Sequence, residues 1–170
     1  MSRHARLSLV GLWGIAGVAA LLVQASVRLA PRAVEAIEGG LSGWEVAALV
    51  GWIAVAAYAE GYRAFQKQFS PRVVARALHL SAHPRLLHAL LAPPFCMGLF
   101  HATRRRMVVS WSVTLGVVAV VLAVRQLPQP WRGIIDAGVV LALAWGVVTL
   151  VWFTARAFGG HTMPVPPDVP

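Results

Sequence analysis

The side chains best suited to chemistry are four histidines and a cysteine that follow one another in a single stretch of the chain. They are His79, His83, His88, Cys96 and His101. The first two have the i, i+4 spacing that places two imidazoles on one face of a helix, as in zinc sites. However, the glutamate of an HExxH motif is missing, the chain has no CxxC pair, and nearby arginines oppose a cation. We therefore expect no cofactor, with a metal or haem site or a pH response of the histidines as alternatives.

Cys96 is the only cysteine, so the chain contains no internal disulfide. Nearby arginines favour a thiolate, but apolar surroundings favour the neutral thiol, and no acidic residue is placed to orient His101 as a base. We therefore expect an inert, buried thiol. Since the sequence also lacks a serine nucleophile elbow, a phosphate-binding loop and a metalloprotease motif, we do not expect an enzyme.

Two acidic residues lie beside apolar segments, where a charge often marks a functional site. Ser42 and Glu45 have the spacing of a capping box, in which the carboxylate reaches back to the start of a helix. Asp136 follows Pro130 closely and favours the positive end of a helix dipole. We therefore predict helix capping for both carboxylates, rather than ion transport.

A basic segment, residues 60–106, carries the remaining candidate contacts. Within it, Ser70 and Pro71 predict the start of a helix in which two arginines and two histidines share one polar stripe. We expect this helix to lie in the membrane interface, with its apolar side among acyl chains and its arginines among lipid phosphates. The predicted lipid or partner contacts are Arg63, Lys67, Arg72, Arg76, Arg85, Arg104, Arg105 and Arg106.

Apolar segments of membrane-spanning length position these residues. Hydrophobic residues make up 58% of the 170-residue chain and charged residues only 12%, which is too apolar for an ordinary soluble domain. A helix needs about 20 residues to cross the hydrocarbon core. Four segments have that length, residues 7–27, 41–59, 107–124 and 134–155. We therefore predict a single all-α membrane domain of four transmembrane helices in two hairpins.

The distribution of arginine predicts the side of the membrane on which each connection lies, because basic residues tend to stay in the cytoplasm. Two arginines near the N-terminus place that end inside, together with the basic segment and the tail, residues 157–170. The short apolar stretch 86–100 has basic residues at both ends. We expect it to form a re-entrant or interfacial helical hairpin that contains Cys96 and bends at Pro93 and Pro94, with a fifth span as the alternative.

Fifteen basic residues against six acidic ones give a net charge of +9, which membrane topology explains without a nucleic-acid partner. The excess of arginine over lysine indicates a GC-rich genome, so we expect the inner membrane of a bacterium. The sequence favours a non-enzymatic accessory subunit or scaffold whose basic face contacts anionic lipid, another copy of the chain or another membrane protein. A small channel or transporter built around the proline hairpin is the first alternative, and a histidine-based metal or haem protein is the second.

Overall fold

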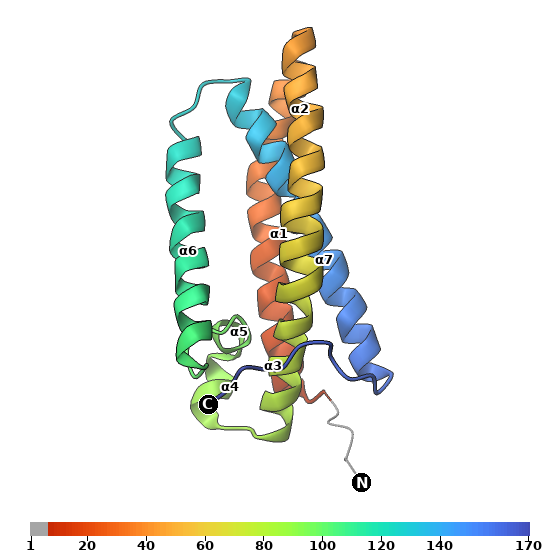
Figure 1. Ribbon diagram of the computed structural model, residues 1–170, viewed down its shortest axis with the longest axis vertical. Helices are drawn as coiled ribbons and strands as arrows, with labels where there is room; N and C mark the ends of the chain where they lie inside the picture. Colours follow the sequence, from red (N-terminus) through yellow and green to blue (C-terminus); the bar gives the residue numbers. More distant parts are fainter. Residues whose placement is uncertain (1–6) are drawn as a thin grey trace.

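The computed structural model describes residues 7–170, and every regular element in that range is a helix. The elements are α1 Leu9–Glu38, α2 Gly43–Ala56, η1 Ala57–Phe69, α3 Ser70–Ala82, α4 Leu86–Leu90, α5 Ala92–Cys96, α6 Arg104–Val124 and α7 Trp131–Phe158. In Figure 1 the chain runs up through α1, down through α2, η1 and α3, up again through α6 and down through α7. The short helices α4 and α5 lie at the lower end, beside the C-terminal tail.

Three helices in the described range are long and apolar enough to cross a membrane, namely α1, α6 and α7. The segment predicted at residues 41–59 is not among them, because its α-helix, α2, is only 14 residues long. By the length and composition of single helices, the candidate spans are therefore three and not the four predicted, and the arrangement in two hairpins stays a prediction. The two N-terminal arginines used to orient the chain, Arg3 and Arg6, lie outside the described residues.

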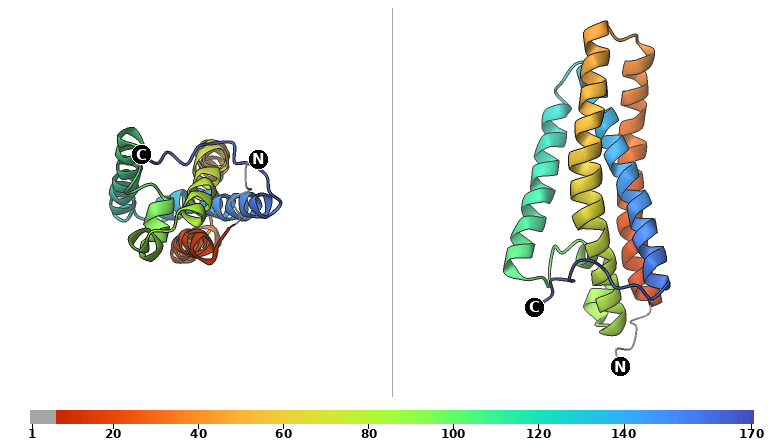
Figure 2. Two further views of the ribbon diagram at one scale, coloured as in Figure 1. Left: turned by 90° about the horizontal axis from the view of Figure 1, so that it is seen from below. Right: turned by 45° about the vertical axis from the view of Figure 1, so that its right-hand side comes forward.

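α2, η1 and α3 form one continuous rod rather than separate helices (Figures 1 and 2). Ala57 and Ser70, at its two junctions, both keep helical backbone angles, with φ −59° and ψ −44° or −47°. The middle section, η1, is a π-helix, a form that is rare over such a length. Gly61, which could have ended the helix, stays helical and packs against the ring of Trp145 instead. The rod therefore continues to Ala82, well past the predicted end at residue 59.

α1 is also longer than the predicted segment, which ended at residue 27. Ser8 caps its start by accepting a hydrogen bond of 3.3 Å from the backbone of Gly11. Pro31 lies inside α1, and the Arg32–Glu35 ion pair at 2.9 Å spans the next turn. The helix ends only where Gly40 adopts a φ of +81°, a conformation that glycine accepts without strain.

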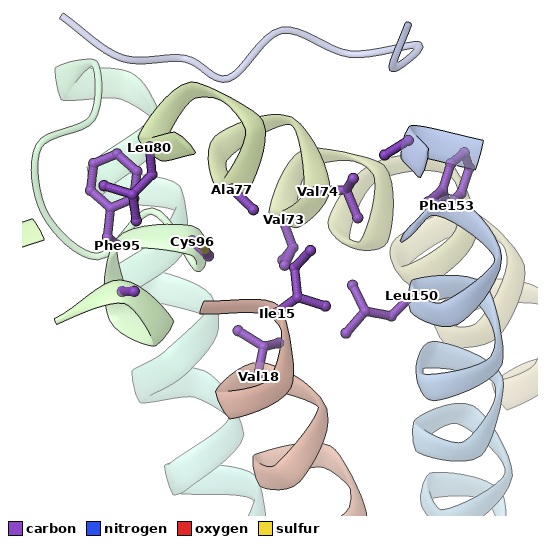
Figure 3. Packing of buried hydrophobic residues seen from close by; sticks show 12 residues of the cluster. Ile15, Val18, Val73, Val74, Ala77, Leu80, Phe95, Cys96, Leu150 and Phe153 are labelled. Carbon is purple, nitrogen blue, oxygen red and sulfur yellow. The ribbon is translucent and has the colours of Figure 1, made fainter. Parts of the chain in front are cut away.

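The hydrophobic core lies where α1, α3, α5 and α7 meet (Figure 3). Its buried members are Ile15, Val18, Val73, Val74, Ala77, Leu80, Ala92, Phe95, Cys96, Leu150, Phe153 and Ala157. Eight of the 13 residues of α3 are buried, so protein rather than acyl chains covers its apolar side. The expectation that acyl chains cover this side was therefore wrong, because α1 and α7 supply the apolar partners that lipid was expected to provide.

Glycines allow α7 to approach its neighbours closely. A Cβ built on Gly133 would collide with the side chain of Ala36 and would lie 2.5 Å from the carbonyl oxygen of Arg32, both on α1. Gly138 lies directly against the indole of Trp52 on α2. These contacts bring the backbones of α1, α2 and α7 together, as small residues do in membrane helix packing.

The predicted proline hairpin consists of α4 and α5, and it bends at a different place. Leu91, with φ −103° and ψ 36°, separates the two helices. Pro93 and Pro94 lie in the first turn of α5, where a missing N–H removes no helical hydrogen bond. Gly14 and Gly17 of α1 lie against this helix, which packs on α1 through Ala92, Pro93 and Cys96.

α6 stands apart from the other long helices (Figures 1 and 2). Of its 21 residues only Ser110 is buried. The helix is attached near its start, where the Ser110 hydroxyl donates to the carbonyl of Met97 at 3.1 Å and the Trp111 indole donates to Leu99 at 2.9 Å. Beyond this attachment, α6 presents apolar side chains on all sides.

Candidate functional site

Arg76 is fully buried and forms the centre of the lower end of the molecule. Its Nε donates to the carbonyl of Phe95 at 2.6 Å, and Nη1 donates to Pro167 at 2.8 Å. Its Nη2 donates to His101 at 3.0 Å and to Phe100 at 3.2 Å. The guanidinium also lies 4.3 Å from the centroid of the Phe95 ring, within cation–π range. One side chain of α3 therefore holds α5, the loop after it and the C-terminal tail.

The charge of Arg76 is maintained despite its burial. Burial lowers the pKa of the guanidinium to about 10, and the nearby cations Arg72 and Arg106 lower it as well, whereas Cys96 and Asp168 raise it. Because this pKa is still well above neutrality, the side chain stays protonated and remains a donor to the surrounding carbonyls. The structure thus places Arg76 inside the protein, away from the lipid phosphates that it was expected to contact.

The C-terminal tail has no helix or strand beyond Phe158, and its last residues pack on the helices. The carboxylate of Asp168 pairs with Nε of Arg72 at 3.0 Å, and its backbone carbonyl accepts a hydrogen bond of 2.9 Å from Thr103. Met163 and Val169 contact the hydrophobic core. Nothing in the proline-rich composition signals these contacts, because they depend on where α3 and the start of α6 lie.

The other basic residues of the predicted contact set differ in exposure. Arg63, Lys67, Arg85, Arg104 and Arg105 are exposed, whereas Arg72 and Arg106 are partly buried. The structure therefore divides the set in two. The exposed members are free to meet a lipid surface or a partner. Arg72, Arg76 and Arg106 gather around Asp168 inside the lower end.

Charge is distributed very unevenly between the two ends. The upper end, residues 28–45 and 125–136, carries four arginines and four carboxylates. The lower part of the molecule, from the middle of the rod downwards (residues 60–106 and 156–170), carries only the carboxylates Glu60 and Asp168. Its nine basic residues are Arg63, Lys67, Arg72, Arg76, Arg85, Arg104, Arg105, Arg106 and Arg156. We call this lower part the basic end.

The histidines form two separate pairs in the basic end. The rings of His79 and His83 stack with centroids 4.9 Å apart, and those of His88 and His101 lie 4.4 Å apart. The ring of His88 also stacks on Phe95, at 4.9 Å. Within residues 7–170, no three His, Cys, Asp or Glu side chains come together in a way that could hold a metal ion.

Acidification is expected to destabilise the fold through these histidines. Burial lowers the pKa of both His79 and His88, and neighbouring positive charge lowers it further. The unfolded chain therefore takes up protons more readily, and stability is lost as the pH falls below about 6.5. We expect the melting temperature to drop between pH 7 and pH 5, and to drop less in His79→Asn and His88→Asn. His161→Asn, at an exposed histidine, is the control, and equal pH slopes in all four proteins would refute the assignment.

Cys96 is 1% exposed and lies against Gly14 of α1. Burial raises the pKa of its thiol to about 12, and the charge of Arg76 only partly offsets this. The thiolate is therefore almost absent at neutral pH, so the side chain is not poised for nucleophilic chemistry.

Capping is confirmed for Ser42 and Glu45 but not for Asp136, which lies beyond the first turn of α7 and caps no helix. The Glu45 carboxylate accepts hydrogen bonds from the backbone N–H of Ser42 at 2.8 Å and from its hydroxyl at 2.6 Å, completing a capping box on α2. Asp136 is 3% exposed and lies 3.9 Å from Arg132 one turn earlier on α7. Both carboxylates belong to the upper end of the molecule, whereas Arg72, Arg76 and Arg106 lie toward the opposite end.

The described chain is helical, with three helices of membrane-crossing length and apolarity, which is consistent with a membrane protein. Comparison of the chain with protein-family models, curated proteins and solved structures finds no match. The distribution of charge, exposure and buried contacts is therefore the basis for a functional proposal.

Proposed function

We propose that this chain is a non-enzymatic, multi-pass protein of the bacterial inner membrane that acts as an accessory subunit or scaffold. Its basic end faces the cytoplasm and contacts anionic lipid or an acidic partner. The observation that carries the proposal is the uneven charge: nine basic residues oppose two carboxylates at one end, whereas the other end is balanced. Basic residues resist translocation and favour the anionic inner surface of the membrane.

The arrangement of the helices supports the same orientation for both chain ends. The rod of α2, η1 and α3 brings the chain back beside α7 to the basic end, and α7 also ends there (Figure 1). The start of α1 and the C-terminal tail thus lie at one end. The proposal therefore places both termini in the cytoplasm, which requires the rod of α2, η1 and α3 to cross the membrane together with α1, α6 and α7.

A scaffold is better supported than a channel. In a channel, the segment with Pro93 and Pro94 would line a path for ions or solutes. Instead, α5 packs on α1 at Gly14 and Gly17, and Phe95 is fully buried. Protein side chains thus occupy the faces of α5 that a pathway would need.

Labelling of single cysteines tests the orientation. In a Cys96→Ala background, Ser42→Cys and Ala82→Cys place exposed thiols at opposite ends. We expect an impermeant maleimide added to right-side-out vesicles to label residue 42 at once and residue 82 only after permeabilisation. The wild-type Cys96 should stay unlabelled until the protein unfolds, because it is buried. Labelling of residues 42 and 82 from the same side would refute the orientation.

Lipid preference tests the proposed contact with anionic membranes. We expect the purified protein in mixed nanodiscs to enrich phosphatidylglycerol over phosphatidylcholine, and the enrichment to weaken at high salt, which screens exposed charges. The variant Arg85→Gln/Arg105→Gln removes two exposed arginines near the lower end, and it should lose up to about thirtyfold in this preference, at roughly 1 kcal/mol per basic residue. The matched variant Arg28→Gln/Arg125→Gln removes two exposed arginines from the upper end, where arginines and carboxylates balance. It should change the preference for phosphatidylglycerol less. Equal losses, or no enrichment in the wild type, would contradict the proposal.

A further inference from the structure

Three guanidinium groups and one carboxylate lie where α3, the first turn of α6 and the tail meet, and one of the three, that of Arg72, pairs with the carboxylate. Asp168 pairs with Arg72 at 3.0 Å, and Arg76 donates only to backbone carbonyls. The backbone N–H of Thr103, which precedes α6, donates to the Asp168 carbonyl at 2.9 Å, and this contact brings Arg106, the third residue of α6, to the same place. This group, which we call the Asp168 cluster, therefore carries two positive charges that no carboxylate within it balances.

Arg106 is the member without a partner. Its side chain lies against Gly98, where a built Cβ would be 3.4 Å from Nε. That Nε is buried, yet no atom among residues 7–170 accepts a hydrogen bond from it. An enclosed donor of a charged group without an acceptor is unfavourable. Because Arg106 is only partly buried, an anion placed at the exposed part of its guanidinium would offset this cost through its charge.

The position of Arg106 indicates the kind of anion. It lies at the start of α6, and the side chains of Val108, Val109 and Trp111 just beyond it are 42% to 59% exposed. α6 stands apart from the other long helices, so acyl chains can lie along it (Figure 2). A phosphate that is attached to acyl chains therefore fits this place better than a free phosphate ion does.

We propose that the Asp168 cluster is a binding site for one anionic phospholipid, whose phosphate is held by Arg106 and Arg72 and whose acyl chains lie along α6. Guanidinium groups recognise phosphate oxygens through paired hydrogen bonds, which suits both arginines. The carboxylate of Asp168 occupies one side of Arg72 and repels the phosphate. The inference rests on the proposed membrane placement, and it adds a specific site to a general electrostatic contact.

The test compares Arg106→Gln with Arg104→Gln, a change of the same kind at an exposed arginine in the same helical turn. Native mass spectrometry of the full chain, released from detergent, measures the binding of phosphatidylglycerol and of phosphatidylcholine with the same acyl chains. At about 0.5 M salt, which screens exposed charges, we expect Arg104→Gln to bind phosphatidylglycerol as the wild type does. Arg106→Gln should remain about fivefold weaker under the same conditions.

Asp168→Asn provides a second variant that does not depend on losing an arginine. It keeps the backbone contacts of the tail and removes the competing carboxylate, so we expect tighter binding of phosphatidylglycerol. Weaker or unchanged binding would overturn the inference. Displacement of the lipid by a large excess of inorganic phosphate would also overturn it, because the site would then be one for free phosphate.

The outcomes separate this inference from the proposed function. If Arg104→Gln and Arg106→Gln lose equal affinity and both recover at high salt, the specific site does not exist but the general contact with anionic lipid stands. If the wild type shows no preference for phosphatidylglycerol over phosphatidylcholine, both fail.

Discussion

Arg76→Met is expected to lower the free energy of unfolding by about 3 to 5 kcal/mol, the largest effect of any single change that we predict. The side chain is fully buried and donates to the carbonyls of Phe95, Phe100, His101 and Pro167. Methionine fills a similar volume but donates no hydrogen bond. Buried carbonyls would then be left without a partner, and α5, the following loop and the tail would lose their common attachment.

Reversible unfolding in mixed micelles, followed by circular dichroism, measures this change. Arg85→Met is the matched control, because Arg85 lies at the same end of the molecule and is exposed. We expect the control to stay within about 0.5 kcal/mol of the wild type, as surface substitutions usually do. Arg76→Lys keeps the charge but not the planar set of donors, so its free energy of unfolding should lie between those of Arg76→Met and Arg85→Met. A small effect of Arg76→Met would mean that the carbonyls find other donors.

Gly133→Ala should have the second largest effect, a loss of about 1 to 3 kcal/mol. The added methyl group would meet the side chain of Ala36 and the backbone oxygen of Arg32, and neither can rotate away. α1 and α7 would have to separate. This contact lies near the upper end, so the change should also weaken the packing of α7 against α2.

Gly51→Ala is the control, since Gly51 is an interior residue of α2 and has no atom within 4 Å of a built Cβ. It should leave the free energy of unfolding unchanged or raise it slightly, because alanine has the higher helix propensity. Thermal unfolding of both variants in one detergent measures the difference. Equal stability of the two variants would show that α1 and α7 are not as closely packed as the structure indicates.

Local features of the sequence predicted one helix start and missed another. Ser42 and Glu45 form a capping box on α2, whereas Ser70 keeps helical backbone angles within the rod and its hydroxyl pairs with Thr149. The capping box depends only on residues within one turn of the chain, so the sequence contains all the information needed to predict it. Helix ends were less predictable. Pro31 and Gly61 both have a helix-breaking residue type, yet each lies inside a helix, since its effect depends on packing and on the neighbouring turns.

The candidate site, too, could be predicted only in part from the sequence. The basic character of residues 60–106 and the clustering of histidines are visible in the sequence. The polar stripe that contains Arg72 and Arg76 was expected to face phosphates, because helical periodicity shows only which residues share a face. The acceptors of Arg76 lie on α5, the following loop and the tail, and Asp168 is far away along the chain. No local pattern links these positions.

The sequence by itself determined an all-helical, strongly apolar chain with its positive charge concentrated in one segment, because composition and periodicity follow from residue types alone. Only the tertiary structure decided that α3 is enclosed, that Arg76 is buried and that α6 stands apart. The physical reason is that a polar side chain can be satisfied by water, by lipid or by distant backbone carbonyls. The choice among these is made by how the helices pack.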